Sequence, residues 1–321
     1  MQVYEAHINL PNNSHSDKLV VMGLLFALLA ALFASGSNFF MRRSIDAGGT
    51  TKGFVLMQMT IAAVVAVLLG PVQTGNYAVN SSVVALGSLA GVFLVTMLFV
   101  LGKALISGPP GLTFSILTAA AVVPAIVMAT LFGAANGFLY TTWHGIGSLL
   151  VLAGLFWAGR TTEGLQNRGR WVTLVVAMFS LHVLLLVLFQ YRALLINTGV
   201  QEAQSAWFMP IYYAVAAVIQ WFVFRRTEAR SLQPKEYLYG AIGGAANSLC
   251  TFFLLQATET ATGLQNAVIF PAFSIGIILL SNWWGQRVYQ EKVNWRAAQV
   301  CAAGLVVGTV DWAALAAVIG F

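Results

Sequence analysis

The sequence predicts an all-α integral membrane protein with about ten transmembrane helices, arranged as two inverted five-helix repeats. Three observations lead to this prediction. Of the 321 residues, 59% are hydrophobic and only 8% are charged, whereas a typical soluble domain carries roughly 25% charged residues. The apolar residues fall in runs of about 20, the length that crosses a bilayer as one helix. The two halves of the chain also repeat a weak common pattern.

Ten apolar runs qualify as spans, and short connections with Gly, Pro or Asn separate them. Residues 1–18 form a polar tail without the basic start and early apolar stretch of a signal peptide. We expect a first repeat over residues 19–158, a cytoplasmic linker over 159–170 and a second repeat over 171–317. The predicted spans are Leu19–Met41, Gly53–Val72, Val83–Ile106, Gly111–Phe132, Thr142–Ala158, Trp171–Gln190, Trp207–Phe224, Tyr237–Leu255, Gly263–Trp284 and Trp295–Asp311.

The basic residues predict the orientation of these spans. Of the 16 Lys and Arg residues, all except Lys18 and Arg192 lie in odd-numbered loops. Because Lys and Arg concentrate in cytoplasmic loops, we expect a multi-pass protein of the cell (inner) membrane with both termini outside the cytoplasm. The lipid bilayer is then its surroundings. No Lys/Arg-rich stripe with interleaved aromatic residues indicates a nucleic-acid partner.

The repeat is visible where Gly111-Leu-Thr-Phe-Ser matches Gly263-Leu-Gln-Asn-Ala, at an offset of about 152 residues. With five spans in each half, the second half enters the membrane inverted relative to the first. Many secondary transporters share this plan and place the substrate site near the membrane midplane, between the repeats.

The clearest motif covers Gly263–Gly308. A long apolar run there carries Pro271, and Glu291-Lys-Val-Asn-Trp and a closing run with Gly304 and Gly308 follow it. This pattern resembles the drug/metabolite transporter superfamily, in its ten-helix EamA-like branch, over nearly the whole chain. The resemblance implies transport of an amino acid, sugar, drug or other small metabolite through a central cavity lined by the first four helices of each half.

The sequence departs from the family pattern at several positions. Gln290 stands where the family has Gly before the Glu. In the first half, Ala119 occupies the Pro position and Pro124 follows five residues later. The family Glu is replaced there by the region Asn136–Phe138. The match is therefore to the architecture of the superfamily and does not identify a substrate.

Ionisable residues within a span are functional candidates because burying a charge in lipid is costly. His182, in the middle of a span, is a candidate for the substrate or proton path, with a structural hydrogen bond as the alternative. Lys103 is either an interfacial anchor or an anion contact at a cavity mouth. Glu259 is either an exposed loop carboxylate or a gate or coupling site.

Uncharged polar residues within the spans are further candidates for lining a cavity, although such residues also join helices by hydrogen bonds. We favour Gln265 and Asn266, which open a span where free N–H groups attract anions, with Asn247 near them. The other candidates are Asn38, Gln58, Thr113, Ser115 and Gln256.

The sequence also limits the chemistry. Cys250 and Cys301 lie inside apolar runs, and their placement suggests neither a metal site nor a disulfide. No catalytic or nucleotide-binding motif is present, so we predict no enzyme activity and no cofactor. The expected partner is a small-molecule solute, and the Gly304-x-x-x-Gly308 face of the last span is a candidate for a homodimer or for internal packing. The alternatives to a transporter are a non-transporting sensor or assembly subunit, and a membrane enzyme acting on lipid-linked substrates.

Overall fold

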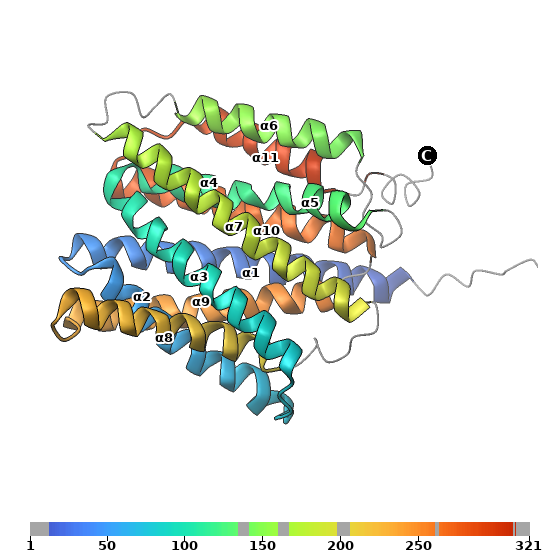
Figure 1. Ribbon diagram of the computed structural model, residues 1–321. Helices are drawn as coiled ribbons and strands as arrows, with labels where there is room; N and C mark the ends of the chain where they lie inside the picture. The colour runs from blue at the N-terminus through green and yellow to red at the C-terminus, as the bar shows by residue number, and fades with distance from the viewer. Residues whose placement is uncertain are drawn as a thin grey trace, which may run out of the picture.

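The computed structural model describes residues 13–133, 141–159, 167–197, 206–260, 263–310 and 312. Within this part of the chain all regular structure is helical, and the helices run side by side along roughly one direction (Figure 1). Six of them are long and apolar enough to cross a membrane. The prediction of an all-α membrane protein is confirmed at this level.

The described residues form eleven α-helices. Most extend several residues beyond the predicted apolar run, because a helix continues where Lys, Arg or Glu can keep the charged group in water. The elements are α1 (Asn13–Asp46), α2 (Thr51–Val67), the π-helical turn η1 (Leu68–Val72), α3 (Ser81–Ser107), α4 (Pro110–Ala119), the 3₁₀ turn η2 (Ala120–Val122), α5 (Val123–Phe132), α6 (Thr142–Gly159), α7 (Arg168–Asn197), α8 (Phe208–Glu228), α9 (Pro234–Thr260), α10 (Gly263–Tyr289) and α11 (Trp295–Thr309).

Proline explains the two departures from α-helical geometry. Pro71 lies inside η1, and its missing N–H removes an ordinary helical hydrogen bond, so the turn there widens. The predicted span Gly111–Phe132 contains two helices, with η2 between them. Pro124 follows that turn and cannot donate back to the preceding turn. The residues of the predicted span are thus helical throughout, with a 3₁₀ turn near the middle.

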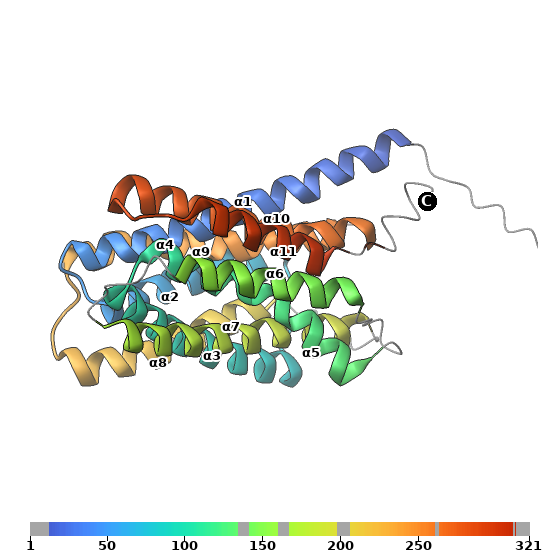
Figure 2. The same cartoon turned by 90° about the horizontal axis from the view of Figure 1, so that it is seen from above.

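The helices pack in cross-connected pairs. α1 packs against α9 and α10, while α7 packs against α3 and α5. Three further pairs are α2 with α8, α4 with α10, and α6 with α11. Figures 1 and 2 show α6 and α11 lying together at the edge of the bundle. Each of these pairs joins a helix from the first half of the chain to one from the second.

The connections α1–α2, α3–α4, α8–α9 and α10–α11 lie at one end of the molecule, on the left in Figure 1. Lys52 Nζ, at the start of α2, lies 3.4 Å from Glu228 Oε1 at the end of α8. The Gly111 N–H, in the first turn of α4, donates to Glu291 in the connection between α10 and α11. We call this region the basic end, because the odd-numbered loops carry most of the Lys and Arg residues.

Glycines form the contact between α6 and α11. A Cβ added at Gly304 would lie 2.7 Å from Val151 N, and one at Gly147 would lie 2.2 Å from Gly308 Cα. Cys301 also donates to Val151 O, at 3.6 Å. The Gly304 and Gly308 face therefore contacts α6 within the chain, which is the internal packing alternative. A homodimer through the last span stays a prediction.

We expect Gly304→Ala to lower stability by about 1–3 kcal/mol, because the new methyl group has no room against α6. Gly36→Ala on α1 is the matched control, since a Cβ there meets no atom within 4 Å. The measurement is the apparent Tm of each purified variant in detergent. Equal Tm values for the two variants would show that the α6–α11 contact is not close.

Candidate functional site

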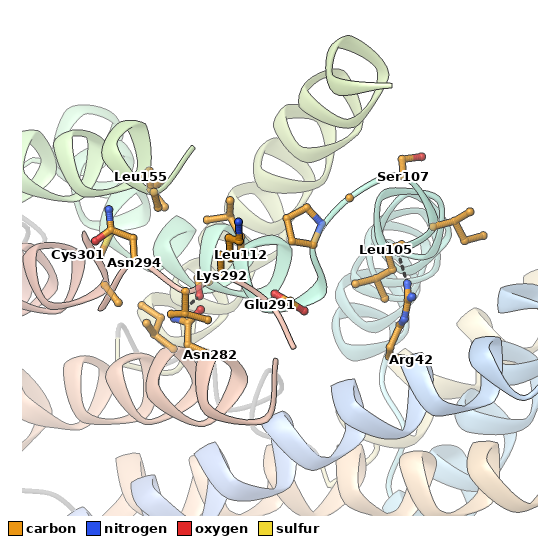
Figure 3. A pocket seen from close by; sticks show the side chains of 18 residues that line it. Arg42, Leu105, Ser107, Leu112, Leu155, Asn282, Glu291, Lys292, Asn294 and Cys301 are labelled. Carbon is orange, nitrogen blue, oxygen red and sulfur yellow. Dashed lines mark hydrogen bonds between the residues drawn. The ribbon is translucent and has the colours of Figure 1, made fainter. Parts of the chain in front are cut away.

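A cavity of about 460 Å³ lies at the basic end. Figure 3 shows that the side chains around it come from several helices that are distant in sequence. α3 and α4 contribute one wall, α10 and the connection to α11 another, and α6 and α11 a third. Its polar lining residues are Arg42, Ser107, Ser115, Asn282, Glu291, Lys292 and Asn294, and its apolar ones include Leu112, Leu155, Ile278 and Ala298.

Glu291 closes the start of α4. Pro109 and Pro110 cannot donate hydrogen bonds, so the first available N–H of this helix belongs to Gly111. The Gly111 nitrogen lies 3.0 Å from Glu291 Oε2 and 3.2 Å from Glu291 Oε1. A Cβ at Gly111 would approach Oε2 to 2.9 Å, so a glycine is needed for the carboxylate to come this close. The carboxylate also faces the positive end of the helix dipole.

Burial raises the pKa of the Glu291 carboxyl to about 7. The Gly111 N–H and the positive charge of Arg42 act in the opposite direction but do not offset the loss of hydration. A carboxyl group with this pKa exists in both protonation states near neutral pH. The cavity wall therefore holds a group that can exchange a proton under physiological conditions.

Two cations share the cavity with Glu291. Arg42, near the end of α1, lies 3.0 Å from Asp46 Oδ1 through its Nε and donates from Nη1 to Leu105 O. Its guanidinium also lies 5.4 Å from the centre of the Tyr289 ring. Lys292 is exposed and has no ion pair with the acidic residues that the structure describes. Arg42 is thus fixed in place, whereas the Lys292 ammonium is available to a solute.

Asn282 extends the polar wall towards the interior. It is 6% exposed on α10, and its Nδ2 donates to Ser115 Oγ at 3.0 Å. Ser115 in turn donates to Gly111 O, at 2.9 Å. Asn294 caps α11 by accepting from Ala297 N at 3.1 Å. The Asn282–Ser115 bond connects α10 to α4, and the Asn294 cap begins α11 at the same cavity.

A second carboxylate, which is fully buried, joins other helices at the same end. Glu236, in the first turn of α9, is fully buried. It accepts from Thr50 N at 2.7 Å, from Gln233 N at 2.8 Å and from Arg230 Nη2 at 2.7 Å. A Cβ at Gly53 would lie 2.4 Å from Glu236 Oε1. Glu236 therefore fixes the α1–α2 connection against the α8–α9 connection.

The structure places the predicted α4 residues at this end. Ser115 is the only one of the predicted candidates that lines the cavity, among the residues described. Thr113 is buried, and its hydroxyl accepts from Trp171 Nε1 at 3.0 Å. It therefore ties α4 to the start of α7.

Two predicted amides lie in separate polar contacts between helices. Gln58 Nε2 donates to Ser37 Oγ at 2.8 Å, and Ser37 donates to Gly243 O, which links α1, α2 and α9. Asn247 Nδ2 donates to the hydroxyl of Tyr213 at 3.2 Å. These networks join helices, and the cavity does not reach their side chains.

Three of the remaining candidates have a described position outside the cavity. His182 Nδ1 lies 2.6 Å from Leu117 O, which matches the structural hydrogen-bond alternative. Lys103 is exposed, and its ammonium lies 4.2 Å from the Phe99 ring centre. Asn38 is half-buried on α1.

The other predicted candidates lie at or near the opposite end. Gln256 is half-buried on α9. The side chains of Glu259, Gln265 and Asn266 lie outside the described residues, so their predicted roles stay predictions.

The residues that shape the cavity were mostly missed by reasoning from single residues. Glu291 is predicted only as part of the family motif. Asn282 lies inside an apolar run and is not among the predicted site residues. A signal existed for Asn282, because an amide beside a serine in an apolar span needs a partner. Arg42 and Lys292 were counted only as loop charges.

Comparison with known proteins supports the fold alone. No family model and no curated protein matches the sequence. Eight chains of solved structures match. One, a crystal structure of a protein, is similar with a TM-score of 0.60 and 15% sequence identity, over 91% of this chain and 96% of that chain. The helical arrangement thus recurs in an experimental structure.

We expect Glu236→Gln to lower stability by about 2 kcal/mol or more, because it leaves Arg230 without its buried charged partner. Glu228→Gln is the control. This carboxylate is 16% exposed and its contacts with Lys52 and Arg230 are longer, at 3.4 and 3.3 Å. Apparent Tm values in detergent compare the two variants, and a larger loss for Glu228→Gln would contradict the assignment.

Proposed function

We propose that this protein is a secondary transporter or facilitator that moves a small metabolite across the cell (inner) membrane by alternating access. In this proposal the chain crosses the membrane ten times, with α4, η2 and α5 acting as one span. The solute class includes amino acids, sugars, nucleotide-like and drug-like molecules. The cavity at the basic end is then the cytoplasmic entrance to the solute path.

The pattern of helix packing supports two inverted repeats. If α7 to α11 repeat α1 to α6, the contact of α1 with α9 has a counterpart in the contact of α7 with α3. In the same way, the contact of α1 with α10 corresponds to that of α7 with α5. The pairs α2 with α8, α4 with α10, and α6 with α11 each join a helix to its own counterpart. Exchange of the halves maps each of these contacts onto another of them or onto itself.

The single observation that carries the transport proposal is the cavity between α4 and α10. These two helices are counterparts in the repeat, and rocking one half against the other changes the space between them. The wall there holds a carboxylate, two cations and a buried amide at the basic end of the bundle. Polar groups gathered around a cavity in this way can contact a solute that enters it.

Transport is tested with proteoliposomes that contain only this protein. We expect uptake of at least one solute from a panel of amino acids, sugars, nucleotides and organic acids, followed with radiolabelled compounds. Ala158→Trp, which places an indole at the cavity wall, is expected to reduce that uptake at least tenfold. Leu152→Trp on the lipid-facing side of the same helix, 58% exposed, is the matched control and should transport normally.

A folded protein that binds a panel member but moves none would instead support a sensor or assembly subunit. If Ala158→Trp and Leu152→Trp reduce uptake equally, the solute path does not run through this cavity.

Orientation is tested with single cysteines in a background where Cys250 and Cys301 are replaced by Ala. We expect Arg287→Cys, exposed at the basic end, to react with a membrane-impermeant maleimide only after the cells are opened. Gln73→Cys, exposed at the other end of α2, should react in intact cells. The opposite labelling pattern would place the basic end outside.

A further inference from the structure

Resting on the proposed transport function, we propose that the cavity takes up an anionic solute together with one proton, and that Glu291 is the group that binds the proton. The solute anion contacts Lys292 and the Arg42 guanidinium. The proton comes from the water that fills the open cavity and returns to water when the solute leaves. Protonation forms an O–H bond on the Glu291 carboxylate, and release of the proton to water breaks it. No bond of the solute is made or broken, so one solute and one proton move as a pair.

The argument begins with the incomplete pairing of Glu291. Among the described residues its carboxylate accepts one backbone N–H, from Gly111, and makes no ion pair within 4.0 Å. Glu236, at the same end, has Arg230 and three further donors. A half-buried carboxylate with one donor retains a strong tendency to become neutral. Of these two carboxylates, Glu291 is therefore the one that can change its charge.

Among the described residues, few charged and titratable groups face Glu291. α1 contributes Arg42, which Asp46 accompanies, α10 contributes Tyr289, and the connection itself contributes Lys292. α11 contributes Cys301, with Arg296 exposed beyond it. α4 contributes no titratable side chain over Pro110–Ala119, and the nearby Lys103 of α3 points to Phe99. The cations therefore exceed the anions around the cavity once Glu291 is neutral.

An anion bound beside Lys292 lies in the same cavity as the Glu291 carboxylate, so the two negative charges repel. Protonation of Glu291 removes this repulsion and supplies a hydroxyl that can donate to the solute. Because the carboxyl already titrates near neutrality, the proton is taken up at little cost. By linkage, the anion binds more tightly as the pH falls through this range. A cationic solute would show the opposite dependence.

The test is isothermal titration of the full-length protein in nanodiscs with benzenesulfonate, which stays ionised at every pH used. We expect binding about five- to tenfold tighter at pH 6 than at pH 8. Titration at pH 7.5 in two buffers of different ionisation enthalpy should show uptake of roughly one half to one proton per bound anion. Neutral benzenesulfonamide and cationic benzylammonium should bind at least tenfold more weakly at pH 6.

Two variants assign the roles. Glu291→Gln keeps an oxygen for the Gly111 N–H, and we expect its binding to change less than twofold between pH 6 and pH 8, without proton uptake. Lys292→Gln should weaken benzenesulfonate binding at least fivefold while the wild-type pH dependence persists. Lys235→Gln, an exposed lysine at the same end that contacts Ala47 O, is the control and should bind normally.

Pairing of an anion with a proton is overturned if wild-type binding is independent of pH or tightens as the pH rises. Equal binding of the neutral or cationic probe overturns the anion preference. If benzenesulfonate binding to Glu291→Gln keeps the wild-type pH dependence, Glu291 is not the group that binds the proton. Proton-linked binding without flux of any panel solute would defeat the transport proposal but leave this site intact. Flux of a panel solute without proton uptake on binding would support the transport proposal and contradict the proton-binding role of this site.

Discussion

The need to satisfy every backbone hydrogen bond without water constrains the whole of this molecule. In the hydrocarbon region an unpaired N–H or C=O is costly, so each segment that crosses it must be a helix. The connections, whose backbone groups need other partners, gather at the ends of the bundle (Figure 1). Where proline removes an N–H, at Pro71 and Pro124, the helix changes to a π or 3₁₀ turn and continues.

The same constraint explains the positions of the Glu236 and Glu291 carboxylates. The starts of α2 and α4 leave N–H groups that the helices cannot satisfy themselves. Glu236 accepts from Thr50 N, and Glu291 accepts from Gly111 N. Both carboxylates come from the second half of the chain and serve helices of the first. They differ in pairing, since Glu236 has Arg230 as a partner and Glu291 only shares a cavity with cations.

Much of the helical architecture is predictable because hydrophobicity is a property of single residues and their neighbours. The run Thr142–Ala158, for example, became α6 with almost unchanged bounds. For the break after Ala119, the sequence signal is Pro124. The cavity was not predictable, because it depends on how α4 and α10 are placed against each other. Glu291 and Gly111 are 180 residues apart, and nothing local to either residue indicates the other.

The distance in sequence between Gly111 and Glu291 also sets the delay between their synthesis. Gly111 leaves the ribosome long before Glu291, by roughly 10–40 s at 5–20 residues per second. Throughout this interval the start of α4 lacks the carboxylate that closes it, and the same holds for α2 until Glu236 arrives. The helices of the first half can form in order, but the starts of α2 and α4 at the basic end are completed only by carboxylates of the second half. The order of synthesis therefore makes the N-terminal half dependent on the C-terminal half for its final hydrogen bonds.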